Sequence, residues 1–354
     1  MKRDRHTIEH YEGCLLGGAV GDALGAPVEF MSLSEIKRQF GPSGIKDYFP
    51  AFGRKGAITD DTQMTLFTAE ALLRAVTRGN HRGIASPCSM GRHSYQRWLV
   101  TQESTYSGGS RVNDGHGESW LMAIPELYSR RAPGHSCLSA LKSSKEGSIE
   151  KPINNSKGCG GVMRIAPVAL APDFPDFFDN GCELAAITHG HPTGFLAAGC
   201  LAQIIRNIID GLDLIEAVQS AKKILTTKRN SGECLSAIEK AIDAFFTKPA
   251  TFETVETLGE GWIAEEALAM GIYCALAADG DFEKGLILSV NHGGDSDSTG
   301  SITVNILGAL LGVSAIPKRY LDSLELRDTI KEIADDLFTG FRDTDEWWDK
   351  YPGY

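Results

Sequence analysis

The sequence predicts an all-α protein built as one compact domain. Strand signals are sparse, whereas apolar residues at helical spacing, framed by residues typical of helix starts and ends, recur along the 354 residues. No low-complexity linker and no repeat of fixed period divides the chain. We therefore expect a single domain over residues 11–354, preceded by a flexible N-terminal extension over residues 1–10.

The first expected helix, residues 11–26, carries a glycine at every fourth position. Gly13, Gly17, Gly21 and Gly25 would line one face of it. Each glycine costs a helix about 1 kcal/mol relative to alanine, so four on one face indicate that something approaches this backbone closely. Tight packing against another core helix is the favoured explanation.

Loops rich in glycine, proline or polar residues separate the next helices. Residues 28–58 are expected to form a long structured loop, after which Thr59 caps a helix. Residues 101–119 and 142–161 form two further polar loops.

The second half of the chain is expected to consist mainly of helices. One begins at Pro192, which suits the first helical position, and runs to Gly211. Another covers residues 262–278, and a shorter one, capped by Asp281, ends at Asn291. An apolar helix follows the polar segment that ends at Ser298.

Composition and charge narrow the possible partners and location. A net charge of −11 argues against a protein that grips nucleic acid, because such binding depends on Lys and Arg. The eight cysteines stand singly, which favours a reducing cytoplasm. No targeting signal is visible, and the apolar stretch 302–316 is too short to span a bilayer. We expect a cytoplasmic protein without a membrane or nucleic-acid partner.

Two short acidic segments share one design. Thr59-Asp60-Asp61 and Asp295-x-Asp297-Ser298 each place two carboxylates and a hydroxyl where a loop enters a helix. Hard cations such as Mg²⁺ prefer oxygen ligands of this kind, although one such segment alone is more often a helix cap. If the two segments met in space, four carboxylates would repel one another unless cations neutralised them. Periodicity does not reveal whether they meet.

The pairing of TDDTQM with GGDSDS resembles the ADP-ribosylglycohydrolase family, whose prokaryotic members include dinitrogenase reductase-activating glycohydrolases. Other stretches fit in the family's order. GCLLGGAVGDALGAPVEF resembles its opening helix and glutamate loop, and SKGCGGVMRIAP resembles its phosphate-binding loop. THGHP and GWIAEEALA also fit, so the resemblance covers roughly residues 11–315.

The resemblance implies an all-α fold whose cleft holds two Mg²⁺ or Mn²⁺ ions. The implied metal ligands are Thr59, Asp60, Asp61, Asp295, Asp297 and Ser298. Many family members have threonine at the position of Ser298, whose hydroxyl can still coordinate. Glu29, Asp60 and Asp61 are implied at the catalytic centre, where Glu29 would act on the scissile ribose or the attacking water.

The resemblance also implies a binding site for the ligand's diphosphate. The implied residues are Ser156, Lys157, Gly158, Cys159, Gly160 and Gly161, where glycines let backbone amides approach anionic oxygens. Some relatives have asparagine at Cys159 and tyrosine at Lys157. We see no histidine or asparagine partner that would make Cys159 a nucleophile.

Three ring side chains have two interpretations each. His189 and His191 are implied near the ligand, although a capping or core role is nearly as well supported. Trp262 could stack on a flat group, but a place in the core is the favoured interpretation.

The implied function is a metal-dependent hydrolase that removes ADP-ribose from mono-ADP-ribosylated protein side chains, reversing an ADP-ribosyltransferase. Arginine is the expected acceptor, because the motifs look bacterial and resemble the dinitrogenase reductase-activating branch. The first alternative is a binding or immunity protein that neutralises an ADP-ribosyltransferase by direct contact, with the basic segment 2–6 reaching the partner. A non-catalytic relative is disfavoured by the complete acidic set. Another two-metal hydrolase, such as a phosphatase, would apply only if the resemblance were wrong.

Overall fold

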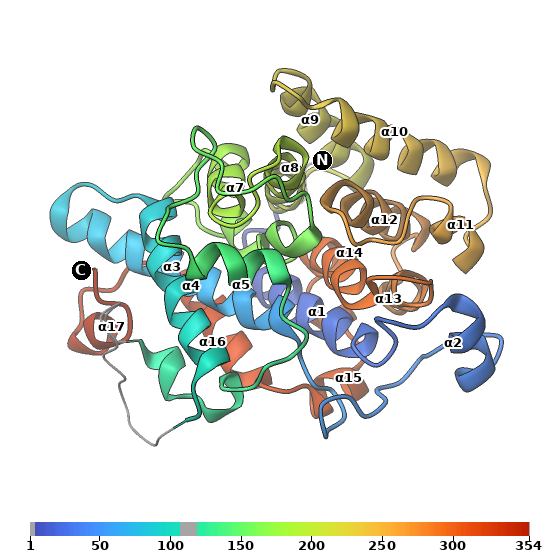
Figure 1. Cartoon of the computed structure of the whole chain (residues 1–354), viewed down its shortest axis with the longest axis horizontal. Helices are drawn as coiled ribbons and strands as arrows, with labels where there is room; N and C mark the ends of the chain where they lie inside the picture. Colours follow the sequence, from blue (N-terminus) through green and yellow to red (C-terminus); the bar gives the residue numbers. More distant parts are fainter. Residues whose placement is uncertain (1–3, 107–118, 354) are drawn as a thin grey trace.

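The computed structural model describes residues 4–106 and 119–353 and contains helices throughout (Figure 1). In the first half these are α1 (Ile8–Gly25), α2 (Leu33–Phe40), α3 (Asp60–Arg82), α4 (Pro87–Glu103), η1 (Trp120–Ala123), η2 (Pro125–Leu127), α5 (His135–Lys142), η3 (Cys159–Gly161), α6 (Ala166–Ala169) and α7 (Phe177–Ala186). In the second half they are α8 (Pro192–Ile209), α9 (Leu214–Thr226), α10 (Gly232–Thr247), α11 (Phe252–Glu256), α12 (Ala264–Ala277), α13 (Phe282–Val290), α14 (Ser296–Leu311), η4 (Val313–Ala315), α15 (Lys318–Ser323), α16 (Arg327–Thr339) and α17 (Asp345–Lys350). The described residues contain only two isolated β-bridges, so the predicted all-α class is confirmed.

Helices α1 and α14 lie side by side near the middle of the molecule, in opposite directions (Figure 1). The facing pairs are Gly13 with Gly308, Gly17 with Val304, Gly21 with Gly300 and Gly25 with Ser296. A Cβ added to Gly21 would lie 2.4 Å from the carbonyl oxygen of Gly300, which no real side chain allows. The predicted glycine face is therefore a helix-packing surface, as favoured from the sequence.

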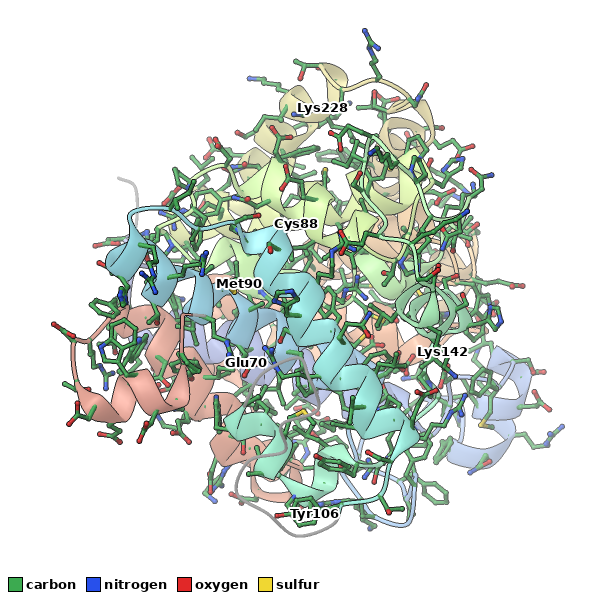
Figure 2. The ribbon with its side chains drawn as sticks, turned by 60° about the vertical axis from the view of Figure 1, so that its left-hand side comes forward. Glu70, Cys88, Met90, Tyr106, Lys142 and Lys228 are labelled. Carbon is green, nitrogen blue, oxygen red and sulfur yellow. The ribbon has the colours of Figure 1, made fainter. Side chains whose placement is uncertain are left out.

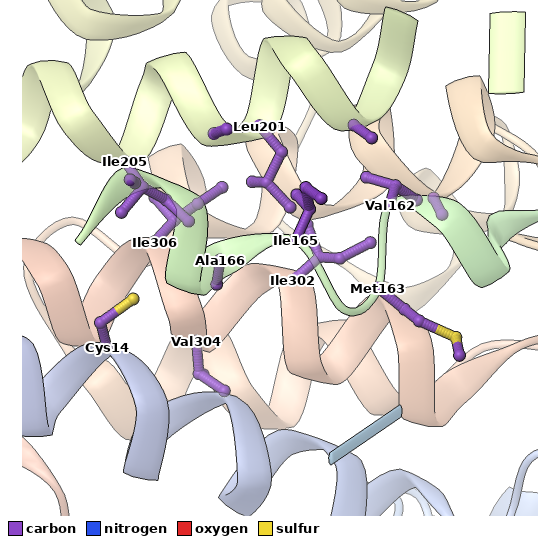
Figure 3. Packing of buried hydrophobic residues seen from close by; sticks show 14 of the residues in the cluster. Cys14, Val162, Met163, Ile165, Ala166, Leu201, Ile205, Ile302, Val304 and Ile306 are labelled. Atoms are coloured by element: carbon purple, nitrogen blue, oxygen red, sulfur yellow. The ribbon is translucent and has the colours of Figure 1, made fainter. Parts of the chain in front are cut away.

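Apolar side chains of α14, α8 and the segment 162–166 meet in the core (Figure 3). Ile302 and Ile306 of α14 are fully buried, as are Leu201 and Ile205 of α8. By length and composition α8 could cross a membrane, but 89% of its 18 residues are buried inside the fold. Packing between helices therefore accounts for its apolar composition.

The N-terminal boundary differs from the expected one. Helix α1 begins at Ile8, and the buried guanidinium of Arg5 donates hydrogen bonds to the carbonyl oxygens of Ile208 and Leu212, each at 3.0 Å. Arg5 and His6, which also contacts Arg206 and Asp210, therefore pack against the end of α8, and Arg5 is not free to reach a partner. Residues 1–3 lie outside the described residues.

Two of the expected loops are partly helical. The segment 28–58 contains α2, which starts with a capping box: Ser32 and Glu35 each accept a hydrogen bond from the other's backbone amide. This Ser-x-x-Glu pattern is a recognised helix start that the sequence analysis overlooked. Helix α4 extends to Glu103, and residues 107–118 of the loop expected over 101–119 lie outside the described residues.

Helix α4 packs on α3, and Glu70, labelled in Figure 2, is the centre of a buried ion pair network between them. Glu70 pairs with Arg97 at 2.8 Å and with Arg74 at 3.4 Å, and accepts a hydrogen bond from Ser94 at 2.8 Å. Burial raises the pKa of Glu70, but the charges of Arg97 and Arg74 outweigh it and hold the pKa below its usual value. The negative charge of this buried carboxylate is thus balanced by the two arginines.

We predict that Gly308→Ala strongly destabilises the protein, because the new Cβ would lie 1.8 Å from the carbonyl oxygen of Gly13. Forcing α1 and α14 apart should lower the free energy of unfolding in urea by about 3 kcal/mol. Gly232→Ala is the matched control, since nothing lies within 4 Å of its added Cβ. Equal unfolding midpoints for the two variants would contradict the packing argument.

Candidate active site

The two acidic segments meet at one cavity of about 310 Å³. Its wall includes Asp60 and Asp61 from the first turn of α3, and Asp295, Asp297 and Ser298 from the start of α14. The other lining residues are Glu29, Phe30, Ala132, Gly134, His135, Ser136, Cys137, Gly158, Cys159, Gly160, Met163, His189 and Trp262. Five carboxyl groups, from Glu29 and the four aspartates, therefore share one cavity.

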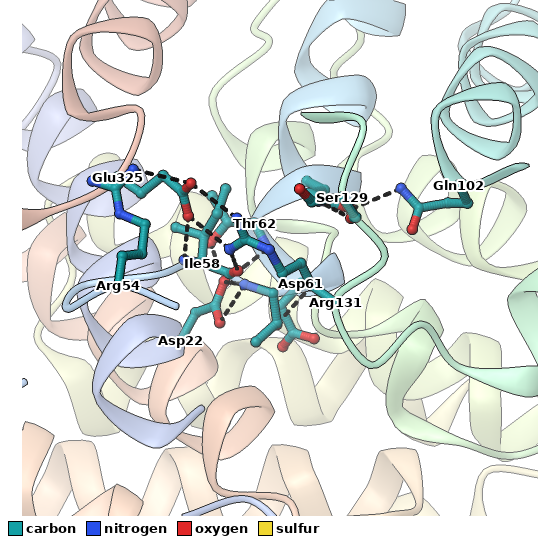
Figure 4. Close-up of polar contacts among 11 residues, drawn as sticks. Asp22, Arg54, Ile58, Asp61, Thr62, Gln102, Ser129, Arg131 and Glu325 are labelled. Atoms are coloured by element: carbon teal, nitrogen blue, oxygen red, sulfur yellow. Dashed lines mark hydrogen bonds and ion pairs between the residues drawn. The ribbon is translucent and has the colours of Figure 1, made fainter. Parts of the chain in front are cut away.

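The start of α3 is fixed by Asp22, a buried residue of α1 (Figure 4). Both of its carboxylate oxygens accept a hydrogen bond from the Thr59 amide at 3.0 Å, and Oδ2 also accepts from the Thr62 amide at 3.1 Å and from the Thr62 hydroxyl. A carboxylate is well placed at the positive end of a helix dipole. Burial raises the pKa of Asp22 to about 6, although these hydrogen bonds oppose the rise.

Asp22 was missed in the sequence analysis. It lies one turn before Gly25, which touches Ser296 at the start of α14. One residue of α1 therefore holds one acidic segment, while a neighbouring turn contacts the other. The available signal was a lone aspartate within an otherwise apolar and glycine-rich helix.

A buried ion pair supports the chain that enters α3 (Figure 4). Arg131 pairs with Glu325 at 2.8 Å and donates to the Ile58 carbonyl oxygen at 2.9 Å. Glu325 accepts from the Ile58 amide at 3.1 Å, and the Arg131 carbonyl oxygen accepts from the Asp60 amide at 3.2 Å. These bonds leave the Asp60 and Asp61 side chains facing the cavity on a fixed backbone.

On the α14 side, Asp295 is the N-cap residue. Its Oδ1 accepts from the Ser298 amide at 3.2 Å, and its Oδ2 accepts from the Cys159 thiol at 2.7 Å. Asp297 accepts from the same Ser298 amide at 2.9 Å. The thiol contact therefore links the start of α14 directly to the glycine loop.

The cavity concentrates negative charge without a compensating cation. Burial, followed by the charges of neighbouring carboxylates, raises the pKa values of Asp60, Asp61 and Asp297 well above their usual range. Burial raises the pKa of Glu29 to about 9, with Asp295 and Asp60 adding to the rise. Within residues 4–106 and 119–353, no lysine or arginine lines this cavity. The cavity differs in this respect from the site of Glu70, where two arginines balance the charge of the buried carboxylate.

The donor set fits a hard divalent cation, which carboxylate and hydroxyl oxygens bind best. Asp61 Oδ2 is buried and has no hydrogen-bond partner, as expected of an atom that awaits a positive ligand. Within residues 4–106 and 119–353, no three His, Cys, Asp or Glu side chains stand in a finished metal-holding arrangement. The carboxylates would have to turn toward a common point to bind an ion.

Thr59 stands apart from the other predicted ligands. It is fully buried behind the cavity wall, and its hydroxyl accepts from the Asp61 amide at 3.3 Å as an N-cap. The capping role is therefore the one visible in the structure, and a turn of its side chain would be needed for coordination.

The glycine loop lines the cavity through its middle three residues, Gly158, Cys159 and Gly160. Its ends do not: Lys157 Nζ pairs with Glu265 at 2.6 Å and Glu233 at 2.9 Å instead of facing the cavity. Burial and the charge of Asp295 raise the pKa of the Cys159 thiol well above its usual value, which agrees with rejecting a thiolate nucleophile.

Three further predicted residues support the loop from outside the wall. The Ser156 hydroxyl lies 2.7 Å from that of Ser136, and a Cβ on Gly161 would lie 3.0 Å from the Cβ of Ala185. His191 is the N-cap of α8, where its Nδ1 accepts from the Thr193 amide at 3.1 Å. For His191 the capping alternative therefore matches the structure.

His189 lies in the cavity wall as a neutral ring. Burial, with the charge of Arg164, lowers the pKa of His189 to about 3. Its Nδ1 lies 2.9 Å from the Thr188 hydroxyl. A Cβ on Gly160 would lie 3.0 Å from the His189 Cε1 atom, so the close approach of loop and ring favours glycine there.

The favoured core position of Trp262 is wrong. Trp262 is 36% exposed and stacks on Phe30, which is 74% exposed, with ring centroids 5.6 Å apart and planes at 18°. The pair lies in the cavity wall beside Glu29. Sequence periodicity did not reveal this, because α12 begins only at Ala264.

The chain was compared with protein families and solved structures. Residues 3–346 match the model of the ADP-ribosylglycohydrolase family. ADP-ribosyl-(dinitrogen reductase) glycohydrolase of Rhodospirillum rubrum is 28% identical over 323 residues, covering 89% of this chain and 90% of the relative. ADP-ribosylarginine hydrolase Tri1 of Serratia proteamaculans is 23% identical over 351 residues, covering 95% of this chain and 80% of the relative. A solved ADP-ribosylglycohydrolase-related protein complex superposes with a TM-score of 0.66 at 26% identity, covering 95% of this chain and 98% of its own.

We predict that the metal-free protein loses stability as pH rises from 7 to 8. The Glu29 carboxyl stays protonated in the fold up to about pH 9, whereas in the unfolded chain it ionises near its ordinary pKa of 4.5. The unfolded state therefore binds fewer protons across this window, so stability falls with rising pH, by about 1.4 kcal/mol per pH unit for each such group. Histidines contribute little above pH 7.

Thermal unfolding in EDTA at pH 7 and pH 8 measures this effect. The Tm should be lower at pH 8, and saturating Mg²⁺ should shrink the difference because it favours the ionised carboxylates. Glu29→Gln, which cannot ionise, should show a smaller difference than the wild type. A Tm that rises from pH 7 to pH 8 in EDTA would overturn the electrostatic account.

Proposed function

The chain belongs to the ADP-ribosylglycohydrolase family, and from this premise we propose that it is a metal-dependent hydrolase that removes ADP-ribose from mono-ADP-ribosylated arginine side chains of proteins. The observation that carries the proposal is the meeting of five carboxyl groups at one cavity where, among the described residues, no lysine or arginine lines the wall. Such a site favours the binding of metal cations, and bound cations can in turn hold the oxygen atoms of a ligand.

We propose two Mg²⁺ or Mn²⁺ ions as cofactors, held by Asp60, Asp61, Asp295, Asp297 and Ser298, with Thr59 as a support or further ligand. When bound, such ions polarise a water molecule and orient the hydroxyl groups of a ribose. The unpaired Asp61 Oδ2 and the raised pKa values of Asp60, Asp61 and Asp297 support this assignment, because a cation would relieve both.

The chain's own residues supply the remaining chemistry. In the proposed reaction the bond from the ribose anomeric carbon to the guanidine nitrogen breaks, and the oxygen of water bonds to that carbon. The departing guanidine nitrogen takes up a proton from the Glu29 carboxyl, one water proton stays on the new ribose hydroxyl, and the other returns to Glu29. The oxocarbenium-like transition state carries positive charge, which the carboxylates around it stabilise. Glu29 is the group proposed to hold and transfer a proton through its carboxyl oxygen.

The glycine loop and His189 are proposed to position the ligand's diphosphate. Gly158 and Gly160 leave the backbone open to close approach, and the ring of His189 is neutral and so adds no charge there. Lys157 is not assigned to the phosphates, because two glutamates engage its amino group.

Arginine is proposed as the acceptor because relatives that span most of the chain include an ADP-ribosylarginine hydrolase and an ADP-ribosyl-(dinitrogen reductase) glycohydrolase. The alternative of a protein that blocks a transferase by direct contact would use the basic segment 2–6, of which the structure describes residues 4–6. Arg5 of that segment is buried against α8.

We predict that the protein releases free ADP-ribose from an arginine-modified protein in Mg²⁺ or Mn²⁺ but not in EDTA. Asp60→Asn/Asp61→Asn should reduce the rate about 100-fold or more, because it removes two charges from the proposed metal site. Asp243→Asn, an exposed aspartate of α10, is the matched control and should leave the rate unchanged. Full activity in EDTA, or in the double variant, would refute the proposal.

A further inference from the structure

A second cavity of about 460 Å³ lies beside the first and shares Glu29, Phe30 and Trp262 with it. We call it the outer cleft. Its remaining wall includes Glu256, the last residue of α11, and Glu260 in the turn before α12. The stacked Phe30–Trp262 pair and the Glu29 side chain thus form a common wall between the two cavities.

The outer cleft is negatively charged. Of the residues that the structure describes, its lining contains the three glutamates and no lysine, arginine or histidine. Glu256 accepts a hydrogen bond from the Gly293 amide at 3.1 Å, and neither it nor Glu260 forms an ion pair with a cation in the described part of the chain. Glu253, on the same helix as Glu256, is by contrast paired with Lys37 at 2.5 Å. The cleft therefore presents two exposed carboxylates that are available to an external cation.

Glu29 supplies an independent indication of a ligand at this wall. Its side chain is only 7% exposed and makes no hydrogen bond with the described residues, although it borders both cavities. A buried carboxyl group of this kind requires a partner that the fold does not provide. The partner must then come from one of the two spaces that Glu29 faces.

The outer cleft is rigidly joined to the start of α14. The Glu260 carbonyl oxygen accepts from the Asp295 amide at 2.8 Å. Gly294, between them in space, has φ of +135° and would place a Cβ 2.0 Å from that same oxygen. The position of the Glu260 backbone is thereby fixed relative to the proposed metal ligands.

We propose that the outer cleft binds the guanidinium of the modified arginine, so that the bond to be cut lies beside Glu29, between the two cavities. This inference rests on the proposed function. A guanidinium is planar and cationic, stacks on aromatic rings and binds carboxylates. The exposed Phe30–Trp262 pair offers the rings, and Glu256 and Glu260 offer the carboxylates. A serine acceptor carries no charge and gains nothing from these glutamates.

The test compares Glu256→Gln/Glu260→Gln with the wild type on two peptides, one ADP-ribosylated on arginine and one on serine. Because each exposed ion pair contributes modestly, KM for the arginine peptide should rise about tenfold while kcat changes less than about twofold. Higher salt should raise the wild-type KM for this peptide and affect the double variant less. The affinity for free ADP-ribose, measured by calorimetry, should not change. Glu253→Gln, on the same helix but outside the cleft, is the matched control.

The outcomes separate the two proposals. An unchanged KM for the arginine peptide in the double variant, with hydrolysis intact, overturns the acceptor cleft and leaves the hydrolase. Hydrolysis of the serine peptide alone overturns both the acceptor cleft and the proposed arginine acceptor, and leaves only a hydrolase of another linkage. Equal increases in KM in Glu253→Gln and the double variant would mean a general surface-charge effect and would also overturn it. No release of ADP-ribose from either peptide by the wild type overturns the proposed function and the inference together.

Discussion

The close contact between α1 and α14 determines where every part of the site lies. Glycines let the two backbones approach so closely that the end of α1 touches the start of α14, at Gly25 and Ser296. One turn earlier, Asp22 holds the start of α3, and just beyond α1 the chain presents Glu29. The carboxylates of α3 and α14 are therefore neighbours because one helix touches both of their first turns.

The protein treats buried carboxylates in two ways. Glu70 and Glu325 are each paired with arginines, so their burial is compensated and they serve the fold. The carboxyl groups of the cavity have no arginine partner in the described part of the chain, and burial among other carboxyls raises the pKa values of Glu29, Asp60, Asp61 and Asp297. Natural proteins leave buried charge uncompensated mainly where a ligand completes it, which is why perturbed titration marks functional sites.

The sequence predicted the helices that have clear caps, including those that start after Thr59, His191 and Asp281. Its periodicity could not predict that the two acidic segments lie close together, because their proximity depends on a contact between helices that are distant in the chain. The glycines at every fourth position of α1 were the sequence feature that reflects this contact, because they face α14. Asp22, the exposed Phe30–Trp262 pair and the outward turn of Lys157 were missed, since each depends on which neighbours surround the side chain.

The contact between α1 and α14 also has a consequence for biosynthesis. Residues joined across it are far apart in the chain: the Asn305 side chain donates to the Cys14 carbonyl oxygen across 291 positions. During translation the N-terminal helix emerges first and must wait for nearly the whole chain before its glycine face is covered. A nascent chain stalled before residue 295 would expose that face and lack Asp295 and Asp297. Catalytic competence is thus withheld until synthesis is almost complete.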